Sequence, residues 1–314
     1  MSQDSAKRYL IIGGTTKAAT TSLYFYLQDH PEVCVSSIKE TRYFLDPAYP
    51  LDSDTRYDGM DNAYDAYFSH ATEGQLLAEA TPDYLYSPVT ASWLSRLYAE
   101  QVHMLFLLRD PISRVESWYK FARQDGHLPM SLSIDEYIEQ MFEGLGKPDL
   151  PQYMRALEQG RYAHYLAPWF KEFTAEQIQI VFFEDVKAAP LEVMQSIAKK
   201  TGIDPAFYEN YTAEVKNETK ALKNPGLHQA YKRFRFIVRN RTHKIPFIHK
   251  RLAWLRRTFE PFYLKLNEAK SEPAPVISDA MQERLISYYQ PDVNALKEMV
   301  NLPEAWQQRY ISVT

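Results

Sequence analysis

The sequence predicts an α/β fold with a central, mostly parallel β-sheet that is flanked by helices on both faces. Short apolar runs of strand length alternate along the chain with segments that have the apolar spacing of helices. The clearest strand, residues 102–108 (VHMLFLL), is apolar apart from one histidine, which is typical of a parallel strand covered on both faces. Ligands of such folds bind at the carboxyl ends of the strands, so those loops are the place to look for a site.

The first third of the chain supplies three of the expected strands. Residues 9–12 predict a short buried strand, and a helix is expected over about 20–30, where Pro31 ends it. Residues 33–36 are a second extended run. The acidic, tyrosine-rich residues 46–68 contain several turn formers and predict an excursion over the surface. A third strand is expected over 75–78, followed by a turn.

The remainder continues the alternation of strands and helices. Pro111 suits the first turn of a helix after the strand at 102–108. Ser133 and Glu136 have the spacing of a capping box, and apolar residues at helical spacing follow them. Residues 177–186 predict another strand, and residues 190–203 another helix. We expect residues 1–314 to form one domain, with a basic helical segment at about 226–260 inserted before the C-terminal helices.

Composition limits the classes of protein that remain. A chain of 314 residues with 45% hydrophobic content can bury a substantial core. The single cysteine, Cys34, excludes a disulfide framework and a zinc site built from cysteine pairs. No stretch approaches the roughly 18 apolar residues of a membrane span, and the N-terminal residues are polar. The sequence therefore predicts a soluble, cytoplasmic protein.

Residues 232–257 reverse the overall charge of the chain. The formal net charge is −4, yet this segment holds ten Lys or Arg and no Asp or Glu, interleaved with apolar residues. Such a segment suits peripheral contact with an acidic polymer or a membrane surface. A solvated helical surface with snorkelling side chains is the alternative.

The loop after the first strand, GGTTKAATTS, has the composition of an anion site. A strand, a loop rich in Gly and Thr, and a helix beginning near Thr20 place free backbone N–H groups and hydroxyls around one point, and Lys17 adds a positive charge. The GxxxxGK[ST] pattern of nucleotide triphosphatases fails, because Ala18 and Ala19 occupy the positions that require glycine and lysine. Taken alone, the loop could equally be an ordinary strand-to-helix connection with a surface lysine.

Four segments together resemble the sulfotransferases that use 3′-phosphoadenosine 5′-phosphosulfate (PAPS). They occur in the order and approximate spacing of that family, and the resemblance is greatest to its carbohydrate branch, the heparan sulfate sulfotransferases and their bacterial relatives. The resemblance implies a P-loop-like three-layer sandwich and covers most of the chain. The segments are KAATTSL, IKETRYF, EATPDYLYSP and LLRDPISRVESWY.

The resemblance implies a site for the donor and for its product, 3′-phosphoadenosine 5′-phosphate (PAP). Arg109 and Ser117 correspond to the family residues that hold the 3′-phosphate, and Lys220, in a late NETKAL segment, corresponds to a third. An internal ion pair with Asp110 or a nearby carboxylate is the alternative role for Arg109. The 5′-phosphosulfate loop corresponds to Lys17, Ala18, Ala19, Thr20, Thr21 and Ser22.

The family chemistry assigns roles to two residues. Glu40 corresponds to the general base that takes the acceptor proton, and Lys17 to the cation beside the transferring group; the scheme requires no metal. A surface carboxylate paired with Lys39 or Arg42 is the alternative for Glu40. The implied partner is a carbohydrate or small-molecule acceptor with a hydroxyl or amino group, not a nucleic acid. Candidate acceptor-binding residues are Arg42, Asp83, Tyr84 and Tyr162.

Three alanines depart from the family pattern. Ala19 and Ala221 replace loop glycines, and Ala80 replaces a lysine near the reaction centre, for which Arg42 is the candidate replacement. Two rival classes therefore remain beside a sulfotransferase. One is a P-loop nucleotide kinase or hydrolase, which would require magnesium, and the other is a non-catalytic, polyanion-binding protein on a sulfotransferase scaffold.

Overall fold

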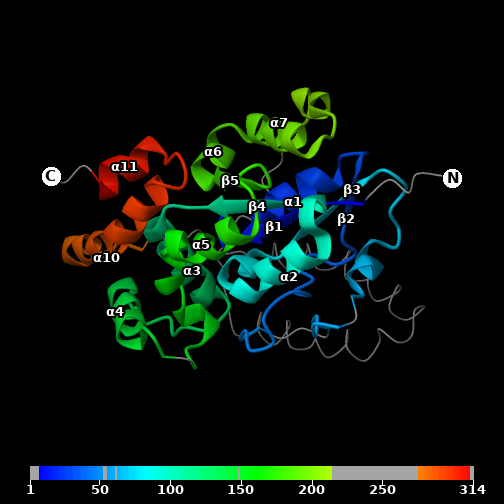
Figure 1. Cartoon of the computed structure of the whole chain (residues 1–314). Helices are drawn as coiled ribbons and strands as arrows, with labels where there is room; N and C mark the ends of the chain where they lie inside the picture. Colours follow the sequence, from blue (N-terminus) through cyan, green and yellow to red (C-terminus); the bar gives the residue numbers. More distant parts are fainter. Residues whose placement is uncertain (1–6, 52–54, 61, 148, 214–274, 312–314) are drawn as a thin grey trace, which may run out of the picture.

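A computed structural model of the chain describes residues 7–51, 55–60, 62–147, 149–213 and 275–311. Its centre is a five-stranded sheet in the order β2-β3-β1-β4-β5, and every neighbouring pair is parallel (Figure 1). The carboxyl ends of the strands therefore share one edge of the sheet. The strands are β1 (Arg8–Gly14), β2 (Val33–Val35), β3 (Leu76–Ala80), β4 (Val102–Leu108) and β5 (Ile178–Phe182).

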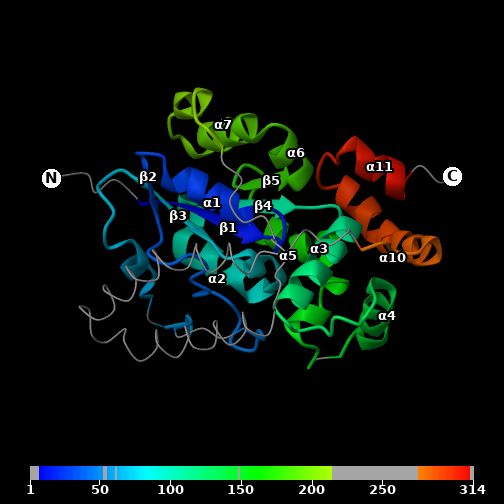
Figure 2. The same ribbon diagram turned by 180° about the vertical axis from the view of Figure 1, so that it is seen from behind.

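Helices cover both faces of this sheet. In the two opposite views, α6 and α7 lie on one side of the strands and α2, α3 and α5 on the other (Figures 1 and 2). The α-helices are α1 (Thr20–Gln28), α2 (Pro88–Tyr98), α3 (Pro111–Gln124), α4 (Ile134–Gly144), α5 (Tyr162–Glu172), α6 (Phe183–Ala188), α7 (Pro190–Thr201), α10 (Asp279–Lys297) and α11 (Glu304–Tyr310). Short 3-10 helices are η1 (Tyr64–Phe68), η2 (Pro82–Tyr86), η3 (Ala99–Gln101), η4 (Gln152–Met154), η5 (Glu158–Gly160) and η6 (Pro205–Glu209).

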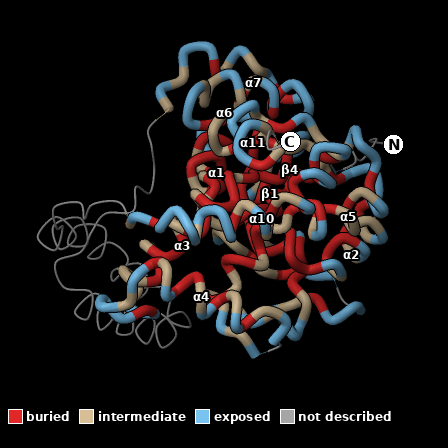
Figure 3. The backbone as a smooth tube through the Cα atoms, turned by 90° about the vertical axis from the view of Figure 1, so that its left-hand side faces the viewer, coloured by how far each residue is buried: buried red, intermediate tan, exposed pale blue. Residues whose placement is uncertain are grey.

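Successive residues of a strand point to opposite faces of the sheet, so their side chains belong to two separate hydrophobic cores. Leu10 and Ile12 of β1 pack with residues of α1 and α7, whereas Tyr9 and Ile11 pack with residues of α2, α3 and α5. Because both faces are covered, a strand such as β4 has no need of an alternating polar face. Figure 3 shows this buried centre with exposed residues around it.

Most of the expected elements are present, and one needs correction. The strand at Val102–Leu108 has the predicted bounds, and the capping box of Ser133 and Glu136 is complete. The prediction of a strand over 177–186 was wrong at its end, because β5 stops at Phe182 and α6 begins at Phe183. Glu184 and Asp185 lie in the first turn of α6, where their charges favour the helix N-terminus.

Two predictions lie outside the described residues: the nucleotide role of Lys220 and the basic segment at 232–257 within the helical insertion at 226–260. Within the described part of the chain, no helix has both the length and the apolar character needed to cross a bilayer.

Candidate active site

The loop between β1 and α1 is tied to the sheet at its start. Thr15 donates its backbone N–H to the carbonyl oxygen of Leu107 in β4, and its hydroxyl hydrogen-bonds to that of Tyr86. Lys17 and Ala19 then adopt left-handed conformations, with φ of 68° and 67°. This backbone leads directly into α1 at Thr20. The loop is therefore held at the carboxyl edge of the sheet, where the sequence predicted it.

Ala19 has the backbone conformation that glycine adopts without cost, so Ala19→Gly is expected to stabilise the protein. A left-handed conformation costs an alanine roughly 1–2 kcal/mol, and the extra chain entropy of glycine offsets about half of that gain. We expect the free energy of unfolding to rise by about 0.5–1 kcal/mol in urea titrations. Ala18→Gly is the matched control, because Ala18 has no positive φ, and it should destabilise. An Ala19→Gly variant as unstable as the control would contradict this account.

Arg109 follows β4 and reaches across to the loop. Its Nη1 donates to the carbonyl oxygen of Lys17 at 3.0 Å, and its guanidinium carbon lies 4.4 Å from the ring centroid of Phe183. Asp110 is engaged elsewhere, by Arg309 at 2.7 Å and the Tyr310 hydroxyl at 3.0 Å. Among the described residues, Arg109 makes no ion pair with a carboxylate. The internal ion pair considered for it is thus absent from this part of the structure.

Lys17 is held close to the same point. Its ammonium lies 4.4 Å from the ring centroid of Phe121, on α3. Burial, and then the charge of Arg109, lower the pKa of Lys17 to about 8, although Asp125 acts in the opposite direction. The loop and the end of β4 thus bring two basic side chains close together, and an anion bound between them would favour the charged form of Lys17.

Buried polar atoms near these cations support the same conclusion. Thr16 Oγ1 and Arg109 Nε are buried and have no hydrogen-bond partner within the described structure. Buried polar atoms normally find partners, and a phosphate or sulfate oxygen would accept from both. The residues present therefore fit a phosphate-bearing ligand.

The pKa of Lys17 predicts how anion binding depends on pH. The ammonium form attracts a phosphate and the neutral amine does not, so PAP affinity should be full below pH 8 and fall as pH rises through about 8. Lys17→Arg should keep its affinity to higher pH, because guanidinium stays protonated. Calorimetric titrations with PAP between pH 6.5 and 9.5 measure this. A flat profile for the wild type would show that Lys17 does not contact the ligand.

Glu40 lies in the segment that follows β2, on the same edge of the sheet. Lys39 Nζ lies 2.6 Å from its Oε1 and Arg42 Nη2 lies 3.3 Å from its Oε2. Burial alone would raise the pKa of Glu40, but the charges and hydrogen bonds of Lys39 and Arg42 hold it below its usual value. The structure thus contains the pairing that was the alternative role for Glu40, and it keeps the carboxylate ionised for either role.

The backbone around Glu40 is held by side chains of the β3–η2 segment. Thr41 donates both its N–H, at 3.4 Å, and its hydroxyl, at 2.8 Å, to Glu79 Oε2, and Arg42 N–H donates to Thr81 Oγ1 at 3.1 Å. Glu40 and Arg42 have φ of 61° and 55°. A loop without secondary structure is therefore fixed in an unusual conformation at a defined place.

Two of the predicted acceptor-binding residues are interior. Tyr84 and Tyr162 have 0% exposure. The Tyr84 hydroxyl accepts from the Phe44 N–H at 3.2 Å, and the Tyr162 hydroxyl donates to the Arg109 carbonyl oxygen at 2.7 Å. As placed here, both hydroxyls support the loops of the site, and the acceptor-binding role of these two residues stays a prediction.

The other predicted residues have the following positions. Ser117 is half-buried on α3, Thr20 and Ser22 are buried in the first turn of α1, and Thr21 is half-buried there. The sequence reasoning missed Thr16, Phe121 and Phe183. Thr16 directly precedes the lysine in a loop already singled out, so its hydroxyl was a readable signal. No sequence signal pointed to Phe121 and Phe183, because their rings reach Lys17 and Arg109 only through tertiary packing.

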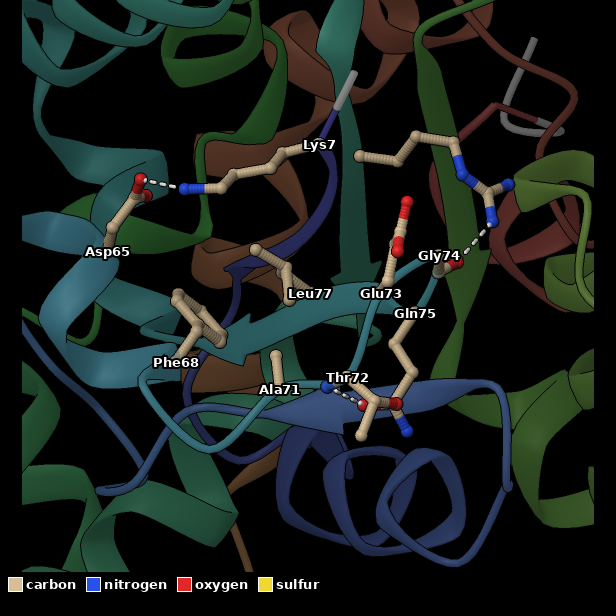
Figure 4. Close-up of a pocket in the computed structure, with 10 residues that line it drawn as sticks. Lys7, Asp65, Phe68, Ala71, Thr72, Glu73, Gly74, Gln75 and Leu77 are labelled. Carbon is tan, nitrogen blue, oxygen red and sulfur yellow. Dashed lines mark hydrogen bonds and ion pairs between the residues drawn. The ribbon is translucent and has the colours of Figure 1, made fainter. Parts of the chain in front are cut away.

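A pocket at the opposite end of the sheet is separate from these loops. It is lined by Lys7, Asp65 and Phe68 among others, with Lys7 and Asp65 paired across it (Figure 4). Its residues lie near the amino ends of β1 and β3. No cluster of metal-binding side chains occurs in the part of the chain that the structure describes.

Comparison with known proteins identifies the family. The sulfotransferase domain family matches residues 9–224. The bifunctional heparan sulfate N-deacetylase/N-sulfotransferase 4 of Mus musculus is 25% identical over 211 residues, 67% of this chain and 23% of that protein. The membrane-associated sulfotransferase kil1 of Dictyostelium discoideum is 37% identical over 139 residues, 41% of this chain and 27% of that protein. The chain thus spans about a quarter of the length of each relative.

A solved structure shares the fold. The crystal structure of a sulfotransferase from Alicyclobacillus acidocaldarius has a TM-score of 0.66 and 21% identity, and the match covers 96% of this chain and 99% of that one. The family match includes the Lys17 loop, the Glu40 segment and Arg109, and it extends over more than half of the chain. The chain therefore belongs to the sulfotransferase domain family.

Proposed function

We propose that this protein transfers the sulfuryl group of PAPS to a hydroxyl or amino group of a carbohydrate or small-molecule acceptor, without a metal. Members of this family use PAPS as the sulfuryl donor. The observation that supports the proposal is the contact of Arg109 with the Lys17 carbonyl oxygen at 3.0 Å, which joins the two loops that we expect to bind the phosphates of the donor. Neither loop alone would distinguish PAPS from other phosphates.

The proposed reaction is an in-line transfer. The acceptor oxygen or nitrogen forms a bond to sulfur while the bond from sulfur to the 5′-phosphate oxygen breaks, and that oxygen keeps the electron pair in PAP. Glu40, ionised because Lys39 and Arg42 lower its pKa, takes the acceptor proton. Lys17 stabilises the growing negative charge on the leaving phosphate, where a fixed cation has its largest effect.

Two observations support a carbohydrate or small-molecule acceptor: the names of the relatives and the position of Arg42 beside Glu40. The relatives include heparan sulfate N-sulfotransferases, whose names describe transfer to a polysaccharide. Arg42 lies beside Glu40 and can supply the positive charge that Ala80 lacks. We therefore assign Arg42 to the reaction centre.

A screen with sulfur-labelled PAPS tests the proposed function. Amino sugars, polysaccharides and phenols should be incubated with the enzyme in EDTA, and labelled product counted after separation. Transfer to at least one acceptor class supports the proposal. Tight binding of sulfated polysaccharides, without transfer to any acceptor, would instead favour a polyanion-binding protein.

A further inference from the structure

Four polar side chains meet inside the protein, close to the Glu40 loop. The Tyr49 hydroxyl and Gln152 Nε2 each donate to Asp83 Oδ1 at 2.8 Å. Gln152 Nε2 and Gln159 Nε2 also donate to the Tyr49 hydroxyl, at 3.2 and 3.1 Å. We call Tyr49, Asp83, Gln152 and Gln159 the Asp83 cluster. Because a carboxylate can only accept, the amide nitrogen of Gln152 must face Asp83 and its oxygen must point elsewhere.

The cluster has acceptor atoms that lack a donor. Both hydrogen bonds to Asp83 go to Oδ1, and none of the described residues donates to Oδ2. The side-chain oxygens of Gln152 and Gln159 are buried without a partner in the same part of the structure. Asp83 is 4% exposed and Gln159 3%. Leaving the two buried amide oxygens unsatisfied is costly, so a donor-bearing group outside the cluster is needed.

The position of Asp83 in the fold, and the effect of the charges of Glu40 and Arg42 on its pKa, place this cluster near the proposed reaction centre. Asp83 lies in η2, directly after β3, so it is on the edge of the sheet that carries the Lys17 and Glu40 loops. The pKa of Asp83 is raised to about 6: burial is the main cause and the charge of Glu40 adds to it, while the Tyr49 hydrogen bond and the charges of Arg42 and Arg114 act in the opposite direction. Glu40 and Arg42 are thus near enough for their charges to act on Asp83.

We propose that the Asp83 cluster is an acceptor subsite for a group with at least two adjacent hydrogen-bond donors, such as neighbouring hydroxyl and amino groups on a sugar ring. The inference rests on the proposed function and narrows its acceptor class. Glu40 removes the proton of the reacting group, and the cluster holds the donor on the neighbouring atom. An acceptor with a lone hydroxyl, such as a simple alcohol or phenol, leaves the cluster unsatisfied.

Two matched acceptors test the subsite. 4-Nitrophenyl β-D-glucosaminide carries adjacent amino and hydroxyl groups, whereas 2-(4-nitrophenoxy)ethanol carries one hydroxyl on a similar aromatic handle. Transfer from sulfur-labelled PAPS should give a kcat/KM at least roughly tenfold higher for the glucosaminide, which corresponds to one or more lost hydrogen bonds to a charged group. Equal values for the two probes, or transfer to neither by a protein that binds PAP, would overturn the subsite.

Asp83→Asn tests the residue itself. The asparagine oxygen can still accept from Tyr49 and Gln152, but an NH2 group replaces Oδ2. That NH2 group can only donate, so it cannot accept a hydrogen bond from the hydroxyl or amino group of the acceptor substrate. The preference for the glucosaminide should fall by roughly tenfold while PAP affinity stays unchanged. Gln152→Leu, at a half-buried position, should also lower the preference for the glucosaminide. It is the variant to use if Asp83→Asn does not fold.

The control is Asp65→Asn, at the far end of the sheet, where the carboxylate likewise accepts from a tyrosine hydroxyl, Tyr9 at 2.7 Å. It should keep the preference. A full preference in folded Asp83→Asn would show that the cluster holds only ordered water. Failure of the wild type to bind PAP would refute the proposed function instead, whereas PAP binding without a preference refutes the subsite alone.

Discussion

Replacing Arg109 with alanine is expected to remove half or more of the thermal stabilisation that PAP gives to the wild type. A ligand that binds only the native state at 100 times its Kd stabilises it by about 2.7 kcal/mol. A charge-assisted hydrogen bond between arginine and phosphate contributes about 1.5–3 kcal/mol. Its loss should raise the Kd for PAP roughly 10- to 100-fold, so at the same PAP concentration the stabilisation should fall to about 0.4–1.4 kcal/mol. Differential scanning fluorimetry with and without PAP measures this.

Arg284→Ala is the matched control for that experiment. Arg284 also stacks on a phenylalanine, with its guanidinium carbon 3.9 Å from the ring centroid of Phe142, but it lies on α10 and pairs with Glu139. Its removal should leave the PAP-induced shift intact. If Arg109→Ala keeps wild-type affinity for PAP, then Arg109 only braces the Lys17 loop and the 3′-phosphate assignment fails.

Glu40→Gln is expected to separate chemistry from donor binding. Glutamine keeps the shape of the side chain and removes its basicity, so single-turnover transfer should fall by roughly 10²-fold or more, the usual scale for loss of a general base. Donor affinity, measured by calorimetry, should remain near the wild-type value. Glu139→Gln, which removes an exposed carboxylate that is also paired with an arginine, should change neither quantity.

Lys17→Ala should instead lower both donor affinity and turnover. Its proposed partner is anionic in the ground state and becomes more negative during transfer, so the lost interaction counts in both states. A Glu40→Gln enzyme with the wild-type single-turnover rate would remove Glu40 from the mechanism. Its carboxylate would then be no more than the partner of Lys39 and Arg42, and Asp83 would be the next candidate base.

Sequence patterns predicted the elements whose cause is local. The strand at Val102–Leu108 could be predicted because an apolar run of that length has few other solutions, and the helix after Ser133 because its cap and its apolar stripe agree. The loop of Lys17 was found by its composition and by its place after a strand. These features depend on neighbours in the chain, which a sequence displays directly.

Features set by tertiary contact could not be predicted. Glu40 has a positive φ in a loop whose next residues are held by side chains distant in the sequence. Thr41 donates to Glu79 of β3, and the Arg42 N–H donates to Thr81, between β3 and η2. Tyr84 is buried, and its hydroxyl accepts from the Phe44 N–H, a contact that the sequence alone did not indicate. The Asp83 cluster forms only when η4 brings Gln152 to Asp83 and η5 brings Gln159 to Tyr49.

The most direct test of the central claim is a calorimetric titration of the wild type with PAP and with ATP, both in EDTA. The paired Lys17 and Arg109 loops predict that PAP binds without magnesium and at least roughly tenfold more tightly than ATP, because ATP lacks the 3′-phosphate that we propose Arg109 holds. Equal affinities, or binding of either nucleotide only when magnesium is restored, would contradict the assignment of PAPS as the donor and would favour a nucleotide kinase or hydrolase.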